Sequence, residues 1–87
     1  MKWNEIRAQY PTNQWLLIEA IQAHSDAGER IVDDLTVVER FVDSVSAMLK
    51  YEELHHQAPE RELYVFHTSR EKLHISERAW LGIRTVV

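Results

Sequence analysis

The sequence predicts an α+β fold, in which a small antiparallel sheet of three or four strands carries one main helix on one face. Two observations predict it. Apolar and polar residues alternate along two neighbouring stretches joined by a glycine-containing loop, as in a β-hairpin. The apolar spacing then changes to the three- and four-residue repeat of a helix over residues 44–57. The expected order is α-β-β-α-β, followed by a helical turn and a last strand.

The first expected element is a short amphipathic helix. Trp3, Ile6 and Tyr10 recur at three- and four-residue spacing, and Pro11 ends the helix because the residue before a proline is biased out of the helical region. Residues 14–23 (QWLLIEAIQA) are rich in β-forming side chains, so they are expected to form the first strand.

The second strand is expected over residues 30–41, after a polar loop at residues 24–29. Its apolar side chains fall on alternate positions, but the adjacent acids Asp33 and Asp34 interrupt this pattern. The interruption predicts a β-bulge or an exposed bend at these two residues.

The main helix is expected over residues 44–57. Asp43 is a favourable N-cap, and Pro59 lies just beyond the expected C-terminus. We expect an apolar stripe that packs on the sheet and is widened by Val45 and Leu49; its other members are Ala47, Met48, Tyr51, Leu54 and Ala58.

Residues 63–67 are expected to form the third strand. The sequence Thr68-Ser69-Arg70-Glu71 that follows matches the T-x-x-E capping box of a helix N-terminus. A helical turn at residues 76–81, with Ser76 as N-cap and Gly82 after its end, and a strand at residues 83–87 complete the expected order.

Length and composition bound the class of protein. A chain of 87 residues is expected to form one domain, residues 1–87, with a thin core. The absence of cysteine excludes disulfides and thiolate nucleophiles, and the longest apolar run, residues 15–18, is far shorter than a membrane span. No export signal is apparent at the N-terminus, so we expect a cytoplasmic protein with no membrane contact.

Charge is unevenly distributed along the chain. The net charge is −4, whereas a nucleic-acid-binding protein normally presents a concentrated basic face. Only the C-terminal third is mildly basic, so nucleic acid is an unfavoured partner. The corresponding alternative function, a nucleic-acid-associated regulator, would use Arg61, Arg70, Lys72, Arg78 and Arg84.

His67, Ser69 and Arg70 form the candidate ligand site. They follow the third strand at an expected helix start, where free backbone amides favour a small anion. The second alternative function is therefore an anion-binding protein or enzyme centred on His67 and Arg70. The capping box explains the same stretch without a ligand, and the chain has neither a glycine-flanked serine nor a Gly-rich phosphate loop. We expect no catalytic residue and no cofactor.

The main helix contains two pairs of residues with the spacing of metal ligands. Glu52 with His55, and Glu53 with His56, have the Glu-x-x-His spacing of carboxylate-bridged metal proteins. Such sites draw ligands from several helices, and histidines in a last turn are already favoured by the helix dipole. No metal is expected.

Four residues are candidates for contact with a partner. Trp15 and Trp80 are large aromatic side chains of the kind found at interfaces, and Arg78 and Arg84 lie in the basic third of the chain. A thin core also favours self-association. The leading interpretation is a non-enzymatic interaction or regulatory module that acts as a homodimer or with a larger protein.

Three stretches carry a resemblance to other proteins that extends over nearly the whole chain: YPTNQWLLIEAIQAHS, ELYVFHTSREKL and ERAWLGIR. In these stretches the chain resembles a group of small bacterial proteins that have the same order of segments. The resemblance implies a free-standing bacterial protein. It implies no activity, cofactor or catalytic residue.

Overall fold

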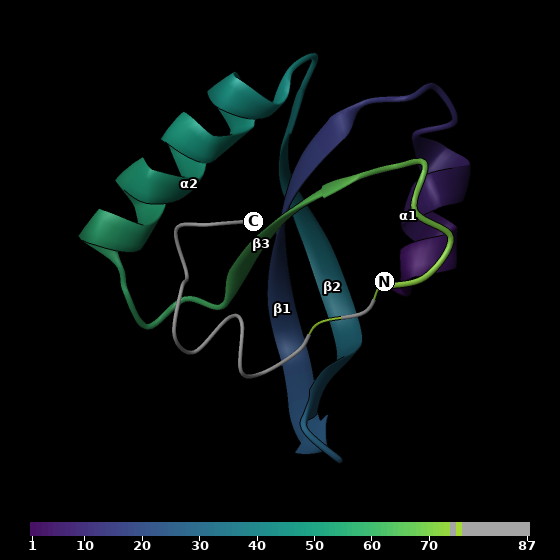
Figure 1. Cartoon of the computed structure of the whole chain (residues 1–87), viewed down its shortest axis with the longest axis vertical. Coiled ribbons are helices and arrows are strands. Elements are labelled where there is room, and N and C mark those ends of the chain that lie inside the picture. The colour runs from purple at the N-terminus through teal and green to yellow at the C-terminus, as the bar shows by residue number, and fades with distance from the viewer. Residues whose placement is uncertain (74, 76–87) are drawn as a thin grey trace.

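The computed structural model describes residues 1–73 and 75, and the elements follow the predicted order α-β-β-α-β (Figure 1). They are α1 (Trp3–Gln9), β1 (Trp15–Asp26), β2 (Glu29–Phe41), α2 (Ser44–Gln57) and β3 (Leu63–His67). The strands form one antiparallel sheet in the order β2-β1-β3, which confirms the α+β class. The predicted helical turn at 76–81 and strand at 83–87 lie outside the described residues.

The hairpin between β1 and β2 is longer and tighter than predicted. The prediction of a loop at residues 24–29 was wrong, because β1 continues to Asp26 and β2 begins at Glu29. Ala27 and Gly28 alone form the turn, with φ of 51° and 79°. Two consecutive positive φ angles are typical of the two-residue hairpin turns whose twist matches the flanking strands.

The predicted irregularity at the two acids of β2 is confirmed. Gln22 pairs with Asp34 and Ala23 pairs with Val32, so the register leaves Asp33 without a partner in β1. An extra residue of this kind bends the strand and increases its local twist.

Both faces of the sheet are covered, although only one cover was predicted. Helix α2 packs on the first face, where the buried cluster comprises Leu17, Ala47, Tyr51, Leu63 and Val65. Helix α1 and the segment after β3 lie on the opposite face (Figure 1), where the buried cluster comprises Trp3, Ile6, Leu16, Ile18, Leu35, Tyr64, Phe66 and Ile75. The predicted helix on one face is therefore confirmed, and α1 adds a cover on the other face.

Helix α2 has the predicted bounds and the predicted cap. The Asp43 carboxylate accepts a hydrogen bond from the Ser46 N–H at 2.7 Å. The predicted apolar stripe, however, was too wide. Val45 and Leu49 are 68% and 63% exposed, because each lies two residues, or about 200° around the helix, from the buried Ala47. Neither helix in the described residues is long and apolar enough to cross a membrane.

Candidate functional site

Thr68 directly follows β3 and is the one buried polar residue in the part of the chain that the structure describes. Its hydroxyl accepts from the Gln14 N–H and donates to the Thr12 carbonyl oxygen, both at 3.1 Å. The backbone N–H of Arg70 donates to the His67 carbonyl oxygen at 3.1 Å, so the chain turns here and begins no helix. The capping-box interpretation was wrong, because the threonine hydroxyl bonds to the loop before β1.

His67 and Ser69 are brought together. The Ser69 Oγ lies 2.7 Å from the His67 Nδ1, and the Ser69 backbone N–H donates to the same nitrogen at 3.2 Å. A serine within hydrogen-bond reach of a histidine is one part of a nucleophilic site, but such a site also needs a third group that orients the imidazole. No acid among the described residues bonds to this ring, so the pair is a feature of the turn.

Arg70 is turned away from that pair. Its guanidinium lies over the Phe66 ring, 5.2 Å from the ring centroid, in a cation–π contact. Phe66 belongs to the cluster under α1, whereas the His67 ring meets Trp15 on the α2 side at a centroid distance of 5.0 Å. The two halves of the predicted anion site thus lie against opposite faces of the sheet.

The candidate partner residues are only partly described. Trp15 is half-buried and packs against the cluster under α2. It serves as cover for that cluster. Arg78, Trp80 and Arg84 lie outside the described residues.

The charged residues just before β3, Arg61 and Glu62, each form an ion pair with a residue of another strand. Arg61 bonds to Glu19 through Nε and a terminal nitrogen at 3.2 and 2.7 Å. Arg30 bonds to Glu62 in the same way, with both distances at 2.9 Å, and the Tyr64 hydroxyl also donates to Glu62. The hydrogen bonds from Arg61 hold the pKa of Glu19 below its usual range.

One of these pairs neutralises a basic residue of the set that a nucleic-acid-binding surface would need. Arg61 is held by Glu19, Arg70 lies over Phe66, and Lys72 lies in the loop after β3. Of the described members of the set, Arg61 is therefore neutralised by Glu19, whereas Arg70 and Lys72 both lie in the segment after β3.

The histidines of α2 have local neighbours. The His55 ring stacks on Tyr51 at a centroid distance of 5.7 Å and an interplanar angle of 6°. Within residues 1–73 and 75, no three His, Asp or Glu side chains come close enough together to hold a metal ion.

Among the residues that the structure describes, three of the most exposed aliphatic side chains lie just before α2 and in its first half. Val42 is 94% exposed, and Val45 and Leu49 follow at three- and four-residue spacing on the outer side of the helix. These three residues, here called the α2 patch, are half of the six large exposed apolar residues in the described part of the chain. The prediction placed Val45 and Leu49 in the packed stripe, because the helical repeat alone does not show how much of the helix surface the sheet covers.

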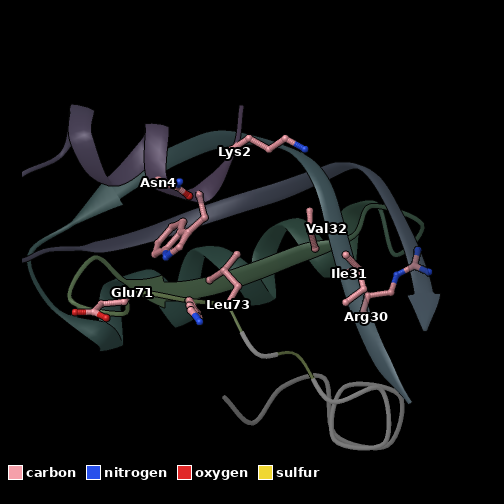
Figure 2. A pocket seen from close by; sticks show the side chains of 9 residues that line it. Lys2, Asn4, Arg30, Ile31, Val32, Glu71 and Leu73 are labelled. Atoms are coloured by element: carbon pink, nitrogen blue, oxygen red, sulfur yellow. The ribbon is translucent and has the colours of Figure 1, made fainter. Parts of the chain in front are cut away.

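A pocket of about 270 Å³ lies on the other side of the sheet, between the start of α1, the start of β2 and the loop after β3 (Figure 2). It is lined by Lys2, Trp3, Asn4, Arg30, Ile31, Val32, Glu71, Lys72 and Leu73. No short motif marks these residues, since they come from three distant parts of the chain.

Comparison with known proteins adds no family. No protein-family model, no curated protein and no solved structure matches the chain.

Proposed function

We propose that this chain is a non-enzymatic interaction module that binds another protein through the α2 patch. The observation that supports it is the exposure of Val45 and Leu49, one turn apart on a helix whose other side is already packed, and of Val42 two residues before that helix. Isolated exposed apolar residues are normal on a protein surface, but a group of them is typical of an interaction site. The partner segment that these apolar residues favour is a helix or strand with an apolar face of its own.

The charges around the patch favour a basic partner. Four carboxylates and two cationic side chains lie between residues 39 and 53: Glu39, Asp43, Glu52 and Glu53 against Arg40 and Lys50. Lys50 lies 3.6 Å from Glu53, and this pair leaves three carboxylates against Arg40. A partner with Lys or Arg beside its apolar residues would meet a complementary rim, whereas two copies of this rim would repel each other.

The energetics favour a weak, reversible contact. Fully burying one Val or Leu side chain is worth about 1.5 to 3 kcal/mol, so three of them offset only part of the cost of association. A regulatory or adaptor role fits an affinity in this range better than a permanent complex does.

Two synthetic helical peptides test the proposal. They share one apolar face and differ only in the flanking residues, which are Lys and Arg in the first and Glu in the second. The wild-type chain should bind the basic peptide at least about tenfold more tightly, and added salt should reduce this preference. Equal binding of both peptides, or binding of neither, would contradict the proposal.

Matched variants locate the contact. The double variant Val45→Gln/Leu49→Gln keeps good helix formers but removes two aliphatic side chains, so it should lose about tenfold or more in affinity. Ile21→Thr is the control, because Ile21 is an aliphatic residue of similar exposure, 57%, that lies on β1 and not on α2. If sedimentation shows a wild-type dimer that the double variant abolishes, the occupant is a second copy and the basic partner is wrong.

A further inference from the structure

We propose that the pocket beside Trp3 binds a small organic anion with an apolar body, such as an aromatic or aliphatic carboxylate. Its volume of about 270 Å³ lies just below the range of about 300 to 1,000 Å³ in which drug-sized ligands bind. The ligand is therefore smaller than a nucleotide. The pocket lies on the α1 side of the sheet, so this site is independent of the α2 patch.

The wall of the pocket is apolar, and its side chains are already held in place by packing and a hydrogen bond. Trp3 is only 7% exposed, and its indole N–H donates to the Arg70 carbonyl oxygen at 2.8 Å, which fixes the ring. Val32 and Leu73 pack against the same buried cluster. Figure 2 shows Leu73 between the residues from the start of α1 and those of β2. An apolar group of a ligand would be buried here without rearrangement of the core.

Positive charge surrounds that wall. Among the lining residues that the structure describes, the cationic side chains are Lys2, Arg30 and Lys72, and Glu71 is the only carboxylate; in Figure 2 its side chain points away from Leu73. Arg30 is neutralised by Glu62. The two lysines therefore decide the sign of the charge that a ligand would meet.

No carboxylate among the described residues forms an ion pair with either lysine. The Lys2 Nζ donates to the Asp33 carbonyl oxygen at 2.8 Å, which is a neutral acceptor. The nearby carboxylate of Asp34 is held by the amino group of Met1, and Lys2 lowers its pKa only as a minor cause. Lys72 makes no ion pair or side-chain hydrogen bond with any residue that the structure describes. Compact ammonium groups beside an apolar wall match a carboxylate on an apolar body.

Three probes separate charge from apolar contact. Phenylacetate carries both features, phenylacetamide has the same shape without the charge, and acetate has the charge without the ring. In a ¹H–¹⁵N NMR titration, phenylacetate should shift the Trp3 indole resonance and the amides of Asn4 and Leu73 in a saturable way. Phenylacetamide should bind at least about fivefold more weakly, and acetate should bind more weakly still.

Lysine variants complete the test. Lys72→Gln removes one charge from the pocket and should weaken phenylacetate binding about fivefold or more. Lys50→Gln is the matched control, since Lys50 lies on α2 on the other side of the sheet, and its affinity should equal that of the wild type. The proposal is overturned if phenylacetate and phenylacetamide bind equally, if Lys72→Gln binds like the control, or if the Trp3 resonance does not move. Failure of the peptide experiment on the α2 patch leaves these outcomes unaffected.

Discussion

At the scale of single residues, Thr68 joins two parts of the chain that are far apart in sequence. Its hydroxyl bonds to Gln14, which is 54 positions away, and its carbonyl oxygen accepts from the Arg7 Nε at 2.9 Å. The loop before β1, helix α1 and the end of β3 therefore meet at one buried side chain. This long-range bonding explains why a local capping motif misidentified its role.

Thr68→Val is expected to destabilise the fold. Valine has the same shape but no hydroxyl, so two part-buried hydrogen bonds, to the Gln14 N–H and the Thr12 carbonyl oxygen, are lost at a cost of about 1 to 3 kcal/mol. Chemical denaturation measures the change in free energy of unfolding. Thr68→Ser keeps the hydroxyl and should retain most of the stability; a larger loss in the serine variant than in the valine variant would show that the methyl group matters more.

At the scale of elements, α2 has two different sides. Ala47 and Tyr51 pack on the sheet, while Val45 and Leu49 lie one turn apart on the outer side. The start of the helix depends on Asp43, whose pKa is lowered chiefly because the Ser46 backbone N–H donates to its carboxylate. The ionised cap therefore stabilises the folded state.

Asp43→Ala should lower the midpoint of thermal unfolding at neutral pH by a few degrees. Because the pKa of Asp43 is depressed on folding, its contribution is present above the ordinary aspartate pKa of about 3.9 and is lost as pH falls through the folded value. The difference between wild type and variant should thus shrink in acid. Asp43→Asn retains an uncharged cap and should lie between the two at pH 7; a constant difference at every pH would contradict this account.

At the scale of the whole molecule, the sheet is covered unevenly. Residues 15–19 of β1 pair with both β2 and β3, whereas the rest of β1 pairs with β2 alone and projects beyond the short third strand (Figure 1). The hairpin end therefore has fewer packed neighbours than the centre of the sheet.

Hydrogen exchange should reveal this difference. The amides of Leu17 and Ile18 lie in the doubly paired part of β1 and should exchange only through global opening. The amides of His24 and Ser25 lie near the turn and should exchange at least about tenfold faster through local opening. Exchange followed by NMR on the native protein measures both, and equal protection along the whole strand would contradict the prediction.

The sequence alone determined much of the element order, because helix caps, prolines and apolar periodicity depend on residues only a few positions apart. The bounds of α2 at 44–57 and of β3 at 63–67 were predicted correctly from periodicity, the Asp43 cap and Pro59. The irregularity at Asp33 was also predicted, since two adjacent acids interrupt the alternation of a strand.

Only the tertiary structure decided which surfaces remain exposed. The exposure of Val45 and Leu49 depends on how far the sheet reaches around α2, and the second sheet face is covered because α1 and Ile75 pack there. The separation of Arg70 from His67 follows from the two faces of β3 and the turn after it. The pocket joins residues such as Lys2, Val32 and Lys72, whose proximity exists only after the chain has folded, because no local interaction brings them together.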